Sequence, residues 1–276
     1  MNKRSTALRK LTAVPHILWS ILFIIAPMIF VIFYAFTDST GAFTLYNVSQ
    51  FANPNYIAVF VRSICFAIVA TFICFLISYP LAYSLTQMKA NTQAMLIMLV
   101  MLPMWMNLLI RTYSWMTILE DTGVINTLLG YIGIAPQKMI NTPAAVILGM
   151  VYNYLPYMIV PLYSSMSKID RSLLEAAKDL GCSPMKVMTK VIFPLSISGI
   201  ISGITMVFVP SISTFYISQK LGGGNFDLIG DTIERQFQIA YNYNLGAAMS
   251  LVLMVLILLC MAVMNKFGND EDEVMI

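Results

Sequence analysis

The sequence has little charge. Lys, Arg, Asp and Glu make up 11% of its 276 residues, and hydrophobic residues make up 59%. Soluble domains carry about 25% charged residues, so this composition is typical of an integral membrane protein. The net charge is only +3, and no basic run is interleaved with aromatic residues. We therefore expect lipid, and no nucleic acid, around this chain.

Residues that serve catalysis or metal binding are also scarce. The only histidine is His16, and the four cysteines (Cys65, Cys74, Cys182 and Cys260) form no CxxC pair. This spacing indicates neither a metal site nor a disulfide framework. We expect no catalytic residue, no metal and no cofactor in the chain itself.

Long apolar runs are the main feature that the sequence does contain. A helix needs about 20 apolar residues to cross a bilayer core. Runs of this kind predict six transmembrane helices, near 15–36, 63–87, 94–118, 144–166, 195–217 and 245–264. The prediction is an all-α integral membrane protein with one transmembrane domain over residues 1–276. Prolines interrupt five of the spans, and neighbouring helices can satisfy the carbonyls that a proline frees.

The distribution of Lys and Arg predicts the orientation, because these residues are enriched in cytoplasmic loops. One side carries eleven of them (Lys3, Arg4, Arg9, Lys10, Lys89, Lys168, Arg171, Lys178, Lys186, Lys190 and Lys266), and the other side carries five (Arg62, Arg111, Lys138, Lys220 and Arg235). Both termini and the loop at 167–194 are therefore predicted to be cytoplasmic.

The loops on the opposite side contain further helix and turn signals. Apolar residues recur at helical spacing over 125–132, which predicts a helix in the outer interface. Three glycines at 222–224 permit backbone turns that other residues avoid. A second short amphipathic helix is predicted over 226–237.

The loop at 167–194 is polar and predicts two helices separated by a sharp break. Ser172 and Glu175 have the spacing of a capping box, so we expect Ser172 to cap the first helix. Gly181 can take the left-handed conformation that ends a helix. Ser183 and Pro184 then begin a second helix, with proline at its first position.

The first of these helices is short enough to need a surface that holds it. We expect Leu173, Ala177 and Leu180 to share one face, with Ala176 at its flank. That face could pack on the ends of the chain's own spans, or on another protein. Periodicity alone leaves both alternatives open.

A resemblance bears on this choice. EAA at 175–177, then three residues and Gly181, then nine residues and VIFP at 191–194 resemble the EAA loop of ABC-importer permeases. Val191 stands where that pattern has Ile, and Phe193 stands where it has Leu. The stretches 102–126, 151–181 and 221–237 are similar to spermidine/putrescine importer permeases, and the N-terminal region resembles the B-type member of the pair.

The resemblance implies a type I ABC importer permease fold, with a cytoplasmic coupling helix between spans 4 and 5. It implies that this helix docks on an ATPase through Leu173, Leu174, Glu175, Ala176, Ala177, Leu180 and Gly181. The chain has no G-x-x-x-x-G-K-[ST] loop, so ATP and Mg²⁺ would be bound by that separate subunit. The implied partners are a second permease in a heterodimer, two ATPase copies and an extracytoplasmic binding protein, in a bacterial inner or plasma membrane.

Three alternatives remain at this point. A permease of the same family could carry another solute, such as thiamine, an iron complex or a phosphonate. A secondary transporter would need intramembrane acids or histidine for coupling, which the spans lack. An integral membrane enzyme would need a catalytic constellation, and none is present.

Aromatic residues near the proline kinks are the candidates for a cation pathway. Aromatic faces attract ammonium groups by cation–π contacts. The candidates for the path are Trp105, Asn107, Tyr113, Phe215 and Tyr216. An aromatic belt at the membrane interface is the alternative interpretation for this kind of residue, above all for Tyr113.

Arg111 is a charge inside the third predicted span. Charges in the membrane are costly and usually paired or functional. Because a cationic substrate would be repelled, we interpret Arg111 as a structural or gating residue, bonded to outer carboxylates or to backbone carbonyls.

Overall fold

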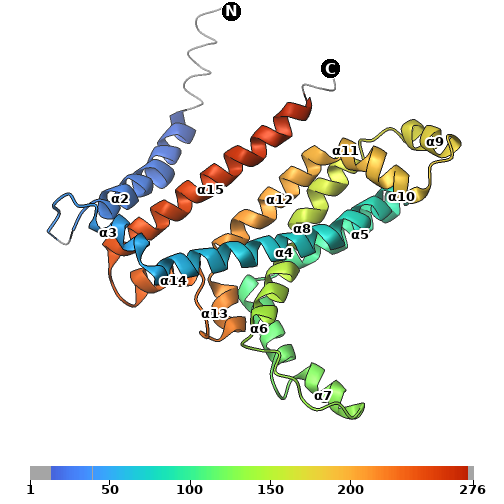
Figure 1. Ribbon diagram of the computed structural model, residues 1–276. Helices are drawn as coiled ribbons and strands as arrows, with labels where there is room; N and C mark the ends of the chain where they lie inside the picture. The colour runs from blue at the N-terminus through green and yellow to red at the C-terminus, as the bar shows by residue number, and fades with distance from the viewer. Residues whose placement is uncertain (1–13, 39, 273–276) are drawn as a thin grey trace, which may run out of the picture. The chain divides into compact units, whose positions relative to one another are not determined.

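The computed structural model describes residues 14–38 and 40–272 (Figure 1). Helices dominate these residues, and they also contain an isolated antiparallel β-bridge between Thr37 and Phe43. The prediction of an all-α fold is confirmed. The chain divides into two compact units. One contains the described residues up to Ile57 together with Thr232–Leu256, and the other contains Ala58–Asp231 with the described residues from Ile257 onward.

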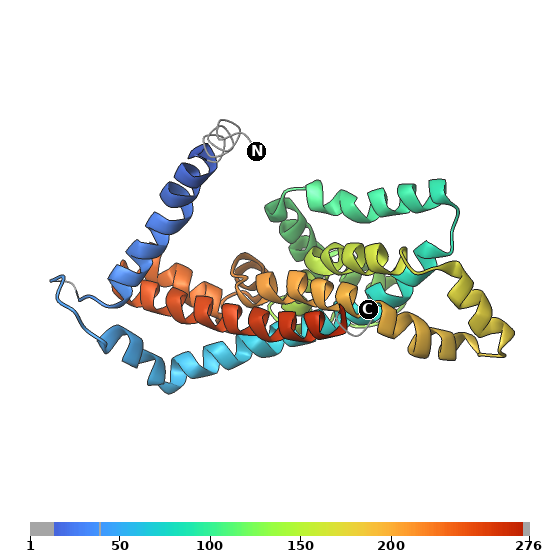
Figure 2. The same ribbon diagram turned by 90° about the horizontal axis from the view of Figure 1, so that it is seen from above.

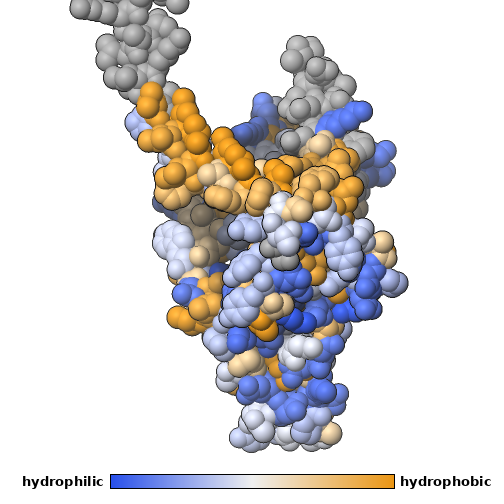
Figure 3. All heavy atoms as spheres, turned by 90° about the vertical axis from the view of Figure 1, so that its left-hand side faces the viewer, coloured by the Kyte–Doolittle hydropathy of each residue, from blue (hydrophilic) through white to orange (hydrophobic). Residues whose placement is uncertain are grey.

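The first unit begins with an apolar helix over Val14–Ala35, which includes a π-helical turn at η1 (Ile21–Ile25) and then α2 (Ala26–Ala35). Its side chains are exposed almost throughout, and Figure 3 shows the surface of this helix as a hydrophobic band next to the grey residues. Two short helices follow, α3 (Tyr46–Ser49) and η2 (Gln50–Ala52). Asn244 donates a hydrogen bond of 2.6 Å to the Thr37 carbonyl, which joins the start of α15 (Tyr243–Asp272) to the end of α2.

The second unit holds most of the helices. They are α4 (Pro54–Thr86), α5 (Ala90–Trp105), α6 (Leu108–Leu119), α7 (Val124–Tyr131), α8 (Pro143–Met166), α9 (Arg171–Asp179), α10 (Pro184–Val187), η3 (Met188–Ile192), α11 (Phe193–Leu195), α12 (Ile197–Ile212) and α13 (Tyr216–Gly222), and α14 (Ile229–Gln238) starts at its end. Met150, Met158, Leu162, Val207 and Leu221 are fully buried in its core.

The close packing of α8 against α12 depends on glycine. A Cβ on Gly199 would meet the Pro161 carbonyl oxygen at 2.9 Å and would overlap the Ser165 side chain. A Cβ on Gly203 would meet the Met158 sulfur at 2.7 Å. Small residues four apart allow helix backbones to approach closely in membrane proteins. Figure 2 shows α8 and α12 running side by side.

Within residues 14–38 and 40–272, four helices are long and apolar enough to cross a membrane unbroken: Val14–Ala35, Pro54–Thr86, Pro143–Met166 and Tyr243–Met264. Two more candidates are bent pairs, namely Ala90–Trp105 with Leu108–Tyr131, bent by 90°, and Pro184–Leu195 with Ile197–Ile212, bent by 74°. The structure therefore has up to six spans, if each bent pair is one span.

The predicted spans over 94–118 and 195–217 each contain a break in the helix. The first is broken at Met106 and Asn107, where Met106 is extended and the Asn107 side chain caps the next helix. The second ends at Ile212 and resumes as α13 at Tyr216. Pro103 and Pro210 lie in the last turn of the helix before each break, where a proline weakens the backbone ladder.

The predicted helices in the loops are present as α7 and α14, although α14 begins at Ile229 rather than near Phe226. Gly223 and Gly224 have φ values of 58° and 73°, as the turn signal predicted. The placement of α7 in an outer membrane interface stays a prediction.

Candidate functional site

The polar loop forms α9, and the residue that caps it is Asp170. The Asp170 Oδ1 atom accepts a hydrogen bond of 3.0 Å from the Ser172 amide. Hydrogen bonds from this amide, which has the larger effect, and from the Ser172 hydroxyl hold the pKa of the Asp170 carboxyl below its usual value. The predicted capping by Ser172 was therefore wrong, because Asp170 is the last extended residue and its carboxylate bonds the amide of the second helical residue.

The end of α9 matches the prediction. Gly181 has a φ of 75°, its amide donates to the Lys178 carbonyl at 2.8 Å, and the Cys182 amide donates to Ala177 at 3.1 Å. These two bonds form a Schellman motif. A Cβ on Gly181 would meet no atom within 4 Å, so the glycine serves the left-handed backbone rather than close packing.

The exposed face of α9 differs from the expected one. Ala177 is buried and Leu174 packs partly against the core, whereas Leu173, Ala176 and Leu180 are exposed. Leu180 is the extreme case, with 84% of its surface accessible. The spacing of three and then four residues places the exposed set on one side of the helix. We call Leu173, Ala176 and Leu180 the outer face of α9; Ala177 does not belong to it.

The second helix of the loop leads to a bend beside α4. Ser183 occupies the cap position of α10 without a side-chain capping bond, and Pro184 follows at the first position. At the end of α11, the fully buried Ser196 lies 3.4 Å from the Tyr79 hydroxyl. The Tyr79 and Phe193 ring centroids are 5.9 Å apart. Tyr79 on α4 is thus packed against the joint between the loop and α12.

Gln93 forms a second polar connection near the loop. It accepts a bond of 2.9 Å from the Tyr163 hydroxyl and donates one of 2.8 Å to the Met88 carbonyl. These bonds join the turn between α4 and α5 to the end of α8. Gln93 was not predicted from the sequence, because no motif in the residues around Gln93 marks it as a functional residue.

Two of the predicted path residues meet in space. The rings of Tyr113 on α6 and Tyr216 on α13 are nearly perpendicular, with centroids 6.4 Å apart. The Lys220 ammonium lies 5.5 Å from the Tyr113 centroid and 5.8 Å from the Tyr216 centroid. Lys220 was not predicted from the sequence, although Lys220 follows Tyr216 by four residues and therefore lies on the same face of the helix. We call Tyr113 and Tyr216 the tyrosine pair.

The structure does not bring the other three predicted path residues into contact with the tyrosine pair. Asn107 caps α6, since its Oδ1 accepts from the Leu109 amide at 2.7 Å. Trp105 ends α5 with 77% of its surface exposed, and Phe215 precedes α13 and is also exposed.

Arg111 does not have the bonding that we expected for it. Only 9% of its surface is exposed, yet its Nε and Nη1 atoms have no hydrogen-bond partner among the described residues. The predicted pairing with carboxylates or carbonyls is therefore wrong for these two atoms.

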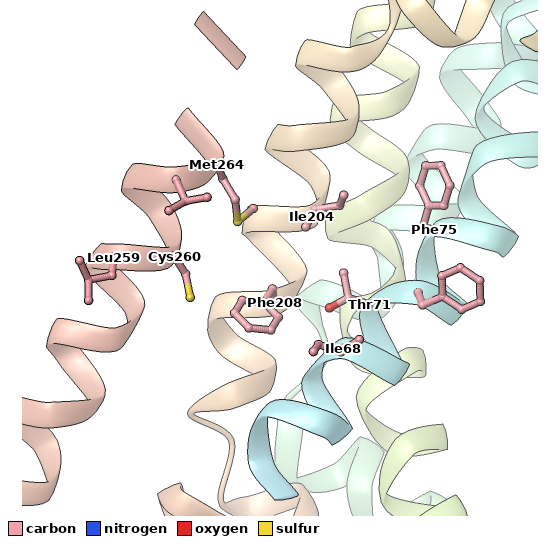
Figure 4. A pocket seen from close by; sticks show the side chains of 10 residues that line it. Ile68, Thr71, Phe75, Ile204, Phe208, Leu259, Cys260 and Met264 are labelled. Atoms are coloured by element: carbon pink, nitrogen blue, oxygen red, sulfur yellow. The ribbon is translucent and has the colours of Figure 1, made fainter. Parts of the chain in front are cut away.

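Two cavities of different character lie in the second unit. One of about 480 Å³ lies between α5, α8 and α12 and has a partly polar wall that includes Ser164, Ser165, Ser198, Ser202 and Lys168. The other, of about 520 Å³, lies between α4, α12 and the later part of α15. Figure 4 shows its apolar side chains with the single hydroxyl of Thr71. A polar wall suits a hydrated cation better than an apolar one.

Comparison with known proteins gives a consistent family. The model of the binding-protein-dependent transport system inner membrane component matches residues 11–269. The spermidine/putrescine transport system permease protein PotB of Haemophilus influenzae is 38% identical, over 96% of this chain and 96% of that protein. The Escherichia coli protein of the same name is 37% identical, over 86% and 89%.

Solved structures support the fold alone, because their sequence identities are low. A chain of a bacterial alginate ABC transporter, in complex with an alginate-bound periplasmic protein, matches with a TM-score of 0.82 and 16% identity. That match covers 96% of this chain and 95% of the other. A chain of the inward-facing MetNI methionine ABC transporter matches with a TM-score of 0.58 and 15% identity, over 78% and 95%.

Proposed function

Because the chain belongs to the family of binding-protein-dependent transport system inner membrane components, we propose that it is the permease subunit of an ATP-driven importer of polyamines. It is a non-catalytic, multi-pass membrane protein. The observation that carries the polyamine assignment is the 38% identity, over nearly the whole of both chains, with a permease named for spermidine and putrescine. The tyrosine pair supports it, since aromatic rings attract ammonium groups.

The energy would come from a partner that docks on the loop at 167–194. The outer face of α9 presents two leucines and an alanine to solvent, and a nine-residue helix with such a face is suited to insertion into a cleft. In this proposal two ATPase copies bind ATP and Mg²⁺, one beneath each permease of a heterodimer. The loop and both termini then lie in the cytoplasm of a bacterial cell, and a binding protein delivers substrate on the opposite side.

Movement of the docked helix would reach the spans through the joint at Ser196. The loop after α9 continues through η3 and α11 into α12, and α12 packs closely on α8 through Gly199 and Gly203. A shift of α9 would therefore act on this helix pair and on α4, which contacts the joint through Tyr79. Rocking of the pair would open the pathway to alternate sides of the membrane.

Uptake by the reconstituted transporter tests the proposal. Proteoliposomes with both permeases, the ATPase and the binding protein should accumulate labelled spermidine or putrescine only when ATP is supplied on the ATPase side. Unlabelled polyamine should compete, and thiamine should not. Competition by thiamine alone, or by an iron complex or a phosphonate, would assign the chain to another solute. Uptake without ATP would contradict the ATP-driven mechanism.

A further inference from the structure

Among the described residues, no carboxylate pairs with the Lys220 ammonium, which lies at the tyrosine pair. In the described part of the chain, Lys220 contacts the Tyr113 and Tyr216 side chains, and neither contact is a salt bridge. Both distances, 5.5 Å and 5.8 Å, are within the roughly 6 Å reach of a cation–π contact. The two rings thus form a site that holds a primary ammonium.

The bound group has the chemistry of the proposed substrate. A lysine side chain is an ammonium on a four-carbon stem. Putrescine is the same four-carbon stem with an ammonium at each end, and one end of spermidine is identical to it. A pair of rings that accommodates the Lys220 ammonium therefore accommodates a terminal ammonium of either polyamine in the same place.

The site is accessible, and it can be vacated without moving the backbone. Tyr113 has 44% of its surface exposed, and Tyr216 and Lys220 are half-buried. The end of α13 is held in place, because the fully buried Leu221 accepts a 2.9 Å bond from the Asn141 amide. The long lysine side chain can swing its charged end into water while its backbone stays fixed.

We propose that Tyr113 and Tyr216 form a binding site for the terminal ammonium of a polyamine, and that Lys220 occupies this site as a tethered competitor until the substrate displaces it. This inference rests on the proposed function. It adds that Lys220 keeps an ammonium in the site while no substrate is bound. Two ammonium groups cannot share the site, because their charges repel.

Equilibrium binding of labelled putrescine to the purified transporter, without binding protein, tests the site. The cation–π contact that holds Lys220 in the site is worth about 0.5–1 kcal/mol. Since about 1.4 kcal/mol corresponds to a tenfold change in Kd, removing Lys220 should change the Kd for putrescine about two- to fivefold. Lys220→Met should therefore lower the Kd for putrescine by about two- to fivefold. Lys220→Arg keeps a tethered cation, so its Kd should equal that of the wild type. Lys138→Met removes an exposed lysine elsewhere and should also leave the Kd unchanged.

The tyrosines provide the second arm of the experiment. Adding Tyr113→Leu or Tyr216→Leu to Lys220→Met should abolish the gain, whereas Tyr113→Phe, which keeps the ring, should preserve it. An unchanged Kd in Lys220→Met, an equal gain in Lys138→Met, or a gain that survives loss of either ring would overturn the proposed site. Polyamine uptake by the wild type distinguishes failure of the proposed site from failure of the proposed function. If the wild type takes up polyamine and Lys220→Met binds putrescine like the wild type, only the proposed site is wrong. If the wild type takes up no polyamine, the proposed function fails.

Discussion

The hydroxyl of Tyr79 on α4 lies 3.4 Å from the hydroxyl of Ser196, at the bend between the polar loop and α12. Tyr79 is buried, and its ring packs between Phe75 and Phe193, with centroids at 5.4 Å and 5.9 Å. The joint between the loop and the spans is thus held mainly by aromatic packing, with one long hydrogen bond.

Truncation of Tyr79 should loosen this joint. Removing a buried aromatic ring costs about 3–5 kcal/mol, so Tyr79→Ala should lower the thermal stability of the complex. It should also lower the amount of substrate taken up per ATP hydrolysed. Tyr79→Phe loses only the long hydrogen bond and should cost about 1 kcal/mol or less. Uptake and ATP hydrolysis measured on the same proteoliposomes give the ratio of substrate taken up to ATP hydrolysed. Equal ratios in Tyr79→Ala and wild type would show that the joint does not carry the coupling.

A charge on the outer face of α9 should weaken ATPase binding. Burial of one leucine contributes about 1.5–3 kcal/mol, so Leu180→Asp should weaken the association by roughly 10- to 100-fold. Met185→Asp is the matched control, since Met185 is also apolar and exposed but lies on α10. Co-purification of the ATPase with each variant is the measurement. Normal recovery with Leu180→Asp would remove this face from the proposed interface.

A single methyl group at Gly199 should disturb the packing of α8 on α12. Its Cβ would meet the backbone carbonyl of Pro161 and overlap Ser165, and neither can yield without moving α8. Overpacking of this kind costs about 1–3 kcal/mol, so Gly199→Ala should melt at a lower temperature in detergent. Gly130→Ala places the same methyl group in α7 where no atom lies within 4 Å, and it should melt like the wild type or slightly higher. Equal melting of the two variants would contradict the close approach.

The cap of α9 should respond to acid. Because hydrogen bonds from Ser172 lower the pKa of Asp170 in the folded state, its stabilising effect is present above the ordinary pKa of about 3.9. It is lost as pH falls through the lower folded-state value. Amide exchange in residues 171–175, corrected for the intrinsic pH effect, should show protection at pH 6 and fraying at the most acidic pH that the complex tolerates.

Asp170→Asn is the control for this titration. Asparagine also caps helices but does not ionise in this range, so its protection should be independent of pH. The same loss of protection in acid with Asp170→Asn would assign the fraying to another group.

The sequence by itself determined the features that depend on local chemistry. Apolar runs of sufficient length predicted the spans, since the hydrocarbon thickness sets the number of residues required. Gly181 predicted the end of α9, because a left-handed backbone favours glycine wherever it occurs. The pattern at 175–194 and the stretches similar to importer permeases indicated the family, which the comparisons then confirmed.

Tertiary structure decided which of several locally equivalent choices was taken. The residues of α9 and its C-cap carry two apolar stripes, and contact with the core buried Leu174 and Ala177, which left Leu180 outside. Both Asp170 and Ser172 can cap a helix, and Asp170 is the cap because it is the last extended residue before α9. Tyr113 and Lys220 are more than a hundred residues apart in sequence and come together because α6 and α13 pack side by side. Such contacts follow from the path of the whole chain, and no local pattern of residues encodes them.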